Sequence, residues 1–321
     1  MQHRARQLAF PAIEFAREAK QPIRGRYAAA RAGQALDPLP ARGRRWMLRH
    51  PLGTLQRIIG EPRRKGPIWA VTMVKNEEVR VAGAVQQLFD GGVDVVVVAD
   101  NLSTDATADV LADLAERLPV IIVRDDEPAY YQGPKMSRLA RAAARNGASW
   151  IVPFDADELW FGIGEPLSER LRLLAGDAAS AAMYDFLPEP GRCDSTDPYR
   201  EMTRRTIAPV TRKTAFRAHL LATIATGNHW VQQPVRVVSD ALAVRHYPFL
   251  GFDHFVQKAV QGGAALAATS LPRNVGEHWR DWADAPDLQR RRMWGELVAR
   301  DTCIDPLPTV PYLQSSSLAQ P

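Results

Sequence analysis

The apolar run Val93–Ala99 constrains the fold more than any other feature of this 321-residue chain. Apart from Asp94 it consists of valine and alanine, and it shows no alternation of polar and apolar side chains. A strand without such alternation is typical of a parallel sheet that helices cover on both faces. We therefore expect an α/β protein in which Asp100 follows a central strand.

Similar strand and helix patterns precede and follow this run. Ile68–Val74 has the length and β-branched content of a strand, and Val81, Val85 and Leu88 recur after it at helical spacing. Four such β-α units in a row predict a doubly wound, mostly parallel sheet. The other expected elements are a helix with Val110, Leu111, Leu114 and Leu118, strands at 120–123 and 150–154, and a helix at 136–146. Pro153 suggests that the last of these strands lies near an edge or contains a bulge.

The β-α pattern ends at the loop 188–198, and a mixed region is expected beyond it. Val235–Ser239 and Leu242–His246 suggest a pair of strands joined by a turn at Asp240 and Ala241. Phe252–Ala267 and Asp287–Arg300 have helical patterns. We expect one catalytic-type domain over residues 66–300 and a short tail over residues 301–321.

Charge divides the chain into two parts. Residues 1–65 contain 15 Lys and Arg against 4 Asp and Glu, whereas the rest contains 26 against 32. We interpret residues 1–65 as a basic extension, partly helical or disordered, and contact with anionic lipid headgroups is the alternative. Its arginines alternate with Ala, Gly and Pro rather than with aromatic residues, so no nucleic-acid partner is expected.

Three further features bear on location. No apolar stretch approaches the roughly 20 residues that a membrane-spanning helix needs. The N-terminus does not have the pattern of a secretion signal. Cys193 and Cys303 are far apart, which gives neither a disulfide framework nor a zinc-ligand pattern. We expect a cytoplasmic protein, with peripheral contact at the inner face of the membrane through residues 1–65 as a further hypothesis.

Polar and acidic residues follow every strand of the predicted parallel sheet. Because ligands bind beyond the carboxyl ends of such strands, we expect these residues to share one rim. Crowded carboxylates need cations or hydrogen-bond donors, and Mg²⁺ or Mn²⁺ commonly share a few carboxylates with substrate phosphates. The rim therefore predicts a divalent ion and a phosphate-bearing substrate. Its candidate residues are Lys75, Asn76, Glu77, Asp100, Asn101, Asp126, Asp155, Asp157 and Glu158.

Several common α/β enzyme classes lack support in the sequence. The turn after the first strand, Val74–Glu78, contains no glycine and has two glutamates, unlike a dinucleotide-binding turn. There is no phosphate loop with Gly-Lys-Ser/Thr and no Gly-x-Ser-x-Gly nucleophile elbow. These absences argue against a Rossmann dehydrogenase, a P-loop NTPase and an α/β-hydrolase.

From Ile68 to Arg280 the chain resembles family 2 glycosyltransferases of the GT-A fold, especially a short bacterial branch. The resemblance implies that Asp100 contacts the base or ribose of a nucleotide, that Asp155 lies near the ribose, and that Asp157 binds the metal bridging the diphosphate. Leu102 departs from the family pattern, which usually has glycine there. The matching segments are Val74–Glu78, Ala99–Asp105, Pro128–Gln132, Val152–Trp160, Gly227–His229, Arg245–Pro248 and Gly276–Arg280.

Other roles are assigned with this resemblance in view. Among Lys135, Arg138 and Arg141, Arg138 is the preferred partner of the leaving diphosphate. A carboxylate must accept the proton of the acceptor hydroxyl, and Glu158 and Asp253 are the candidates. The remaining assignments are His246 as a metal ligand and Tyr131, Trp160 and His229 on the acceptor side. Tyr131 is also a candidate for stacking on sugar or base, and a metal-ligand or base role is the alternative for His229.

The reaction that the resemblance implies is transfer of a sugar from a nucleoside-diphosphate donor to an acceptor hydroxyl. Direct displacement at the anomeric carbon would invert its configuration. A glycan or glycolipid acceptor, in surface polysaccharide or glycoconjugate synthesis, fits the same resemblance. The alternatives are a nucleotidyltransferase, which would favour a glycine-rich basic loop after the first strand, and a non-catalytic protein that binds nucleotide sugars.

Overall fold

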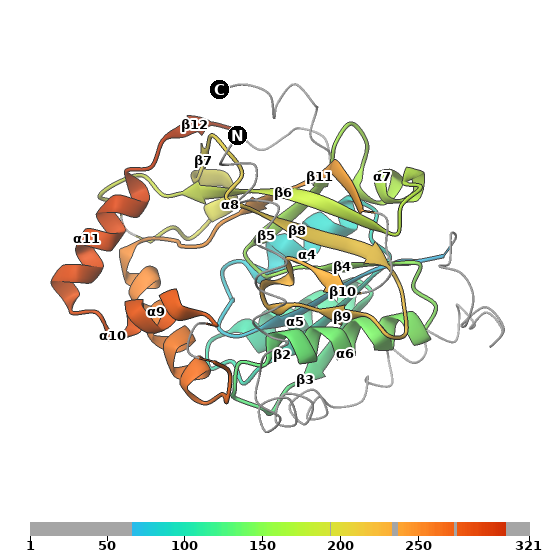
Figure 1. Cartoon of the computed structure of the whole chain (residues 1–321), viewed down its shortest axis with the longest axis horizontal. Coiled ribbons are helices and arrows are strands. Elements are labelled where there is room, and N and C mark those ends of the chain that lie inside the picture. Colours follow the sequence, from blue (N-terminus) through green and yellow to red (C-terminus); the bar gives the residue numbers. More distant parts are fainter. Residues whose placement is uncertain (1–65, 193, 233–236, 273–274, 306–321) are drawn as a thin grey trace.

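A computed structural model of the chain describes residues 66–192, 194–232, 237–272 and 275–305. The basic extension 1–65 and residues 306–321 of the predicted tail lie outside the described residues. At the centre are four parallel strands in the order β3-β2-β1-β4 (Figure 1). These strands are β1 (Ile68–Val74), β2 (Val95–Asp100), β3 (Val120–Arg124) and β4 (Trp150–Pro153).

Helices cover both faces of the parallel strands, as the sequence predicts. On β1, Ile68 and Ala70 pack with α4 (Val81–Asp90), α5 (Thr107–Arg117) and α7 (Leu167–Leu173). Trp69 and Val71, which point the other way, pack with α6 (Gln132–Arg145). Every residue of β2 from Val95 to Ala99 is buried, which explains its lack of polar alternation. The prediction of a doubly wound α/β fold is confirmed.

A mixed sheet continues from β4. Next to β4 lie the antiparallel strand β8 (Thr211–Arg217) and then β6 (Ala178–Leu187), β7 (Arg204–Thr206) and β12 (Thr302–Ile304). The strand β11 (Val237–His246) pairs in parallel with β6 and antiparallel with β5 (Glu158–Gly162). Short elements complete this region: α8 (Pro198–Glu201), β9 (Thr223–Ile224), the 3-10 helix η2 (Thr226–Asn228) and β10 (Val231–Gln232).

Two expectations for this region are wrong. Residues 237–246 form one strand rather than two strands joined by a turn, because Asp240 (φ 60°) produces a bulge and the pairing with β6 resumes after it. Pro153 belongs to an interior strand, between β1 and β8. The reason is local: β8 pairs only with Trp150 and Ile151, so no ladder bond is required from Pro153 on that side.

The C-terminal helices form a separate aromatic layer. The helix α9 (Phe252–Ala267) has the predicted bounds, α10 (Glu277–Asp284) packs against it, and α11 (Asp287–Val298) ends two residues before the predicted limit. Phe249, Phe255 and three tryptophans fill the space between them. Beyond α11, Asp305 forms ion pairs with Arg205 and Arg245, so residues 302–305 pack on the body. No helix within the described ranges is long and apolar enough to cross a membrane.

Candidate functional site

The loops that follow β1 and β2 are joined at the carboxyl edge of the sheet. The backbone N–H of Asn76 donates to Ser103 Oγ at 3.0 Å, and Asn76 Oδ1 accepts from the N–H of Thr104 at 2.8 Å. The N–H of Glu77 donates to Thr107 Oγ1 at 2.8 Å. Asp100, at the end of β2, accepts from the N–H of Ser103 at 3.2 Å and remains partly exposed at the rim.

Leu102, which replaces the glycine usual in the resembling family, has a left-handed backbone (φ 57°) and a 37% exposed side chain. This conformation costs a residue with a Cβ about 1–2 kcal/mol, whereas the exposed side chain contributes little packing. We expect Leu102→Gly to raise the free energy of unfolding by about 0.5–1 kcal/mol, after the entropy of glycine in the unfolded chain is subtracted. Urea unfolding measures this change. Leu102→Ala is the control: because it keeps the strained backbone, equal stabilisation by alanine would refute the explanation.

A buried ion pair fixes the loop after β3. Lys135 and Asp125 are both 0% exposed, and Lys135 Nζ lies 2.6 Å from Asp125 Oδ2. Burial raises the pKa of Asp125 and lowers that of Lys135, and their mutual attraction opposes both shifts. The amide of Asn101 donates to the same carboxylate at 2.9 Å, so this predicted nucleotide contact also anchors the loop. Asp126 points to the surface, where it pairs with Arg124.

The acidic cluster lies at the junction of β4 and β5. Carboxylate oxygens of Asp155, Asp157 and Glu158 lie within 4.8 Å of one another. Asp155 Oδ1 accepts hydrogen bonds from the amides of Gln132 (3.1 Å) and Asn228 (3.0 Å). These donors come from the start of α6 and from η2, so two separate elements fix the orientation of Asp155.

Glu158 and Asp155 share the ammonium group of Lys213, which lies on β8. Lys213 Nζ is 2.7 Å from Asp155 Oδ2 and 2.7 Å from Glu158 Oε1, and it donates to the carbonyl of Gly227 at 2.6 Å. Trp160 Nε1 donates to the other oxygen of Glu158 at 3.1 Å. Glu158 is 0% exposed, and burial raises its pKa to about 7 although Lys213 opposes the shift. The two carboxylates raise the pKa of Lys213 despite its burial, so it is charged.

Three cationic groups surround Asp157. Its Oδ2 lies 2.5 Å from Lys258 Nζ, 3.6 Å from His246 Nε2 and 3.8 Å from Arg80 Nη1. Burial alone would raise the pKa of Asp157, but Lys258, His246 and Arg80 outweigh it and hold the pKa well below its usual range. Asp157 is therefore ionised, and its charge is already balanced by the protein.

Two of these cations also have an acidic partner of their own. His246 Nδ1 donates to Asp185 Oδ1 at 2.7 Å, across the pairing of β11 with β6. The two carboxylates raise the pKa of His246 to about 10, against the effect of burial. Arg80 Nε donates to Glu77 Oε2 at 2.8 Å, and Arg80 Nη1 donates to the carbonyl of Tyr247 at 3.0 Å.

The structure brings some of the predicted residues to this cluster and places others elsewhere. Arg80 links Glu77 to Asp157, and His246 Nε2 lies beside the carboxylate of Asp157. Trp160 is fully buried beneath Glu158. His229 donates from Nδ1 to the carbonyl of Arg212 at 2.8 Å, and its pKa falls to about 4 because it is buried near Lys213. Tyr131 hydrogen-bonds Ser270, in the loop after α9.

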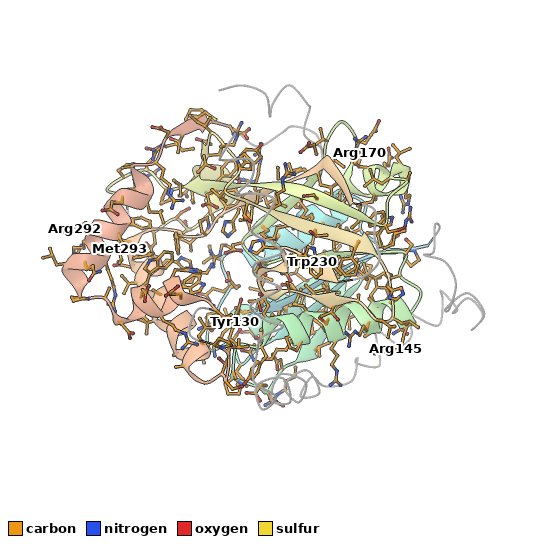
Figure 2. The ribbon with its side chains drawn as sticks, in the orientation of Figure 1. Tyr130, Arg145, Arg170, Trp230, Arg292 and Met293 are labelled. Atoms are coloured by element: carbon orange, nitrogen blue, oxygen red, sulfur yellow. The ribbon has the colours of Figure 1, made fainter. Side chains whose placement is uncertain are left out.

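The other predicted residues lie farther out. Asp253 is exposed in the first turn of α9, and no hydrogen bond or ion pair among the described residues joins it to the acidic cluster. Burial and the charge of Arg145 lower the pKa of Arg138 on α6. Arg145 is the last residue of this helix, and Tyr130 lies near its other end (Figure 2). Lys75 is partly exposed beside the β1 end, and its charge helps to lower the pKa of Lys135.

Sequence reasoning missed the cationic partners of the acids, namely Arg80, Lys213 and Lys258, and it missed Asp185, the acidic partner of His246. The bounds of the helix that carries Lys258 were predicted, and a spacing of four residues puts His254 and Lys258 on one face of that helix. This spacing is the signal that could have identified Lys258. No comparable signal was available for Lys213, because the sequence of β8 does not have the pattern of a strand.

The donor set suits a hard divalent cation, since oxygen ligands are those that Mg²⁺ and Mn²⁺ prefer. The buried acidic triad Asp155, Asp157 and Glu158 is of the right chemical type and spacing. Glu158 is the least available member because the indole N–H, Lys213 and a backbone N–H surround it. An ion would therefore bind on the side of Asp157 and Asp155, where Lys258 now contacts Asp157.

Comparisons with known proteins give only remote similarities. No family model matches the sequence, and no curated protein sequence matches it. Among solved structures, residues 1–349 of S. aureus TarS in complex with UDP align at 14% identity and a TM-score of 0.35, over 68% of this chain and 69% of that chain. The same fragment in complex with UDP-GlcNAc aligns at 12% identity and a TM-score of 0.33, over 71% and 73%. A mycobacterial protein aligns at 16% identity and a TM-score of 0.33, over 65% and 76%.

Proposed function

We propose that this chain is a glycosyltransferase that moves a sugar from a nucleoside-diphosphate donor to an acceptor hydroxyl. The observation that carries the proposal is the convergence of Asp155 and Asp157 with cationic side chains at the carboxyl edge of a parallel sheet. A diphosphate requires both a cation and hydrogen-bond donors around it, and open α/β sheets bind ligands at this edge. The sequence resemblance to family 2 glycosyltransferases agrees with this assignment.

Mn²⁺ or Mg²⁺ is the proposed cofactor, with Asp157 as its principal ligand. His246 would join it as a ligand through Nε2 after losing the proton that its raised pKa keeps on the ring. When bound, such an ion neutralises the charge that develops on the leaving diphosphate. The chain supplies Asp100 at the rim for the nucleoside and Asp155 for the ribose. Asp155 is suited to that task because Gln132, Asn228 and Lys213 fix its orientation before a substrate arrives.

The acceptor hydroxyl loses its proton to a carboxylate of the chain, and the reaction proceeds with inversion. Asp253 and Glu158 are the two proposed bases. Asp253 is accessible, whereas Glu158 is enclosed by Trp160 and Lys213 and would need a change in those contacts to reach a hydroxyl. Asp253→Asn and Glu158→Gln, each assayed for transfer to an added acceptor, separate the two assignments.

The proposed biological setting is synthesis of surface polysaccharide or glycoconjugate at the cytoplasmic side of a membrane. Its support is the family resemblance together with the excess of 11 positive charges in residues 1–65. Anionic lipid would attract that extension electrostatically. Cosedimentation of the full chain with phosphatidylglycerol vesicles, and with neutral vesicles as the comparison, measures this attraction.

The decisive experiment offers a panel of uridine, guanosine, cytidine and thymidine diphosphate sugars with Mn²⁺ or Mg²⁺. We expect nucleoside diphosphate release from one or a few donors, loss of release with a chelator, and recovery when Mn²⁺ is restored. Release of pyrophosphate from a nucleoside triphosphate plus a sugar phosphate would instead identify a nucleotidyltransferase. Metal-dependent binding of a nucleotide sugar without any turnover would identify a non-catalytic binding protein.

A further inference from the structure

We propose that Lys258 is a displaceable counter-ion of Asp157, which an incoming divalent cation replaces so that the Lys258 ammonium becomes a ligand of the donor diphosphate. This inference rests on the proposed function, because it assigns a role in metal and diphosphate binding at the same site. Lys258 Nζ lies 2.5 Å from Asp157 Oδ2, and its other contact is the carbonyl of Pro248 at 3.2 Å.

Among the three cations around Asp157, Lys258 is the one that can leave. Arg80 is held by Glu77 and by the carbonyls of Tyr247 and Pro248, and its side chain is 2% exposed. His246 is held by Asp185. In the described part of the chain Lys258 forms no ion pair except with Asp157, and its side chain is 24% exposed. Its flexible four-carbon stem can carry the ammonium to another anion without disturbing the fold.

The charges around Asp157 explain why an exchange is needed. Glu77 faces Arg80, Asp157 faces Lys258 and Arg80, and Asp185 faces Arg300 as well as His246, so each of these acids already has a cationic partner. A divalent ion added to this balanced group would be repelled by the ammonium that already neutralises Asp157. Phosphate oxygens arriving with the ion would accept the displaced ammonium and restore the balance. Metal and diphosphate should therefore bind cooperatively, each strengthening the other.

Lys258 also lies where a diphosphate could meet it. His254 precedes it by one helical turn, and the charges of Arg80, Lys258 and Asp157 all act on the pKa of His254. Burial and the two cations lower that pKa to about 2, so His254 is neutral. Its Nδ1 accepts from the N–H of Leu250 at 3.2 Å, which leaves the proton on Nε2. This face of α9 thus offers an ammonium and a neutral N–H donor next to the acidic cluster.

The test measures Mn²⁺ affinity by calorimetry without nucleotide, in the wild type and in three variants. We expect Lys258→Gln to bind Mn²⁺ about tenfold more tightly, because the competing ammonium is absent. Lys258→Arg, which keeps the charge, should bind Mn²⁺ like the wild type. Arg300→Gln is the matched control for net charge, since Arg300 is half exposed and pairs with Asp185 at 3.6 Å rather than with Asp157. Thermal unfolding verifies that each variant is folded.

Three results would overturn the exchange: no gain of affinity in Lys258→Gln, an equal gain in Arg300→Gln, or no Mn²⁺ binding by any of the proteins. The role toward the diphosphate has its own measurement, the binding of UDP and of GDP at saturating Mn²⁺. We expect the nucleotide that binds, UDP or GDP, to have about tenfold lower affinity for Lys258→Gln than for the wild type. This change is opposite in sign to the expected change in Mn²⁺ affinity. Unchanged affinity, or no binding of either to the wild type, would refute this second role.

These outcomes are separable from those of the proposed function. If no nucleotide sugar is turned over but Lys258→Gln still tightens Mn²⁺ binding, the counter-ion role stands and the glycosyltransferase assignment fails. If turnover is observed and Mn²⁺ affinity does not change, the assignment stands and the exchange fails.

Discussion

Replacing Asp157 by Asn is expected to lower nucleoside diphosphate release by about 10³-fold, with the protein still folded. The proposed reaction places negative charge on the leaving diphosphate, and Asp157 is the carboxylate around which the balancing cations are arranged. Asparagine keeps the shape of the side chain but not its charge, so a metal ion would lose its principal ligand. Steady-state kinetics with the donor identified from the nucleotide-sugar panel measure the change.

The fold should survive this substitution because the neighbouring cations have other partners. Arg80 keeps its ion pair with Glu77, and His246 keeps Asp185. Only Lys258 loses its acid, and it is exposed enough to turn toward water. We expect a loss of about 1–2 kcal/mol in the free energy of unfolding, which is small beside the effect on catalysis.

Asp240→Asn is the matched control for Asp157→Asn. Asp240 is an exposed aspartate that pairs with Arg212, and its left-handed backbone is one that asparagine tolerates. It should release nucleoside diphosphate at the wild-type rate. If Asp157→Asn also retains the wild-type rate, the metal assignment is wrong. If Asp157→Asn is unfolded, the alternative acidic partners of Arg80 and His246 do not compensate for the lost charge.

The parallel half of the fold was predictable because its signals are local. Val95–Ala99 is buried on both faces and therefore contains no polar residue, and the helix that follows each strand has apolar residues at a regular spacing. The position of Asp155 and Asp157 followed from the same logic, since the carboxyl ends of parallel strands share one edge. Here the sequence pattern alone was sufficient to place an acidic group in the fold.

The mixed half depended on pairings between distant segments. The strand β8 has the sequence Thr211-Arg212-Lys213-Thr214-Ala215-Phe216-Arg217, which by composition resembles a solvated basic segment. It becomes a buried strand because β4 and β6 pair with its two edges. Asp240 and Ala241 resembled a hairpin turn because a turn and a bulge both favour a left-handed residue. In both cases tertiary partners decided between local alternatives.

The cations that balance the acidic cluster are likewise distant from it in the sequence, and for this reason they were not predicted. Lys213 is 58 residues from Asp155 and Lys258 is 101 residues from Asp157, so no local spacing connects the partners. From the sequence, a divalent ion was the expected balance for the acidic rim. The structure shows that lysine and arginine side chains also pair with these carboxylates.

Removing Lys213 should have the largest effect on stability of any single substitution at the site. Lys213→Met keeps most of the side-chain volume but leaves Glu158, which is 0% exposed, and Asp155 without their shared cation. Breaking a buried ion pair from one side costs about 3–5 kcal/mol. In a domain of this size that loss corresponds to a fall in Tm of roughly 10 °C, which thermal unfolding followed by circular dichroism measures.

The double variant Lys213→Met with Glu158→Gln distinguishes charge from packing. Glutamine is similar in size to glutamate and can still accept from Trp160 Nε1, so it removes the unpaired charge and keeps that contact. Asp155 retains Gln132 and Asn228 as donors and is partly exposed. We therefore expect the second substitution to restore at least about half of the lost stability, a non-additive result typical of residues in contact. A double variant no more stable than Lys213→Met would show that Lys213 contributes through packing rather than by balancing the carboxylates.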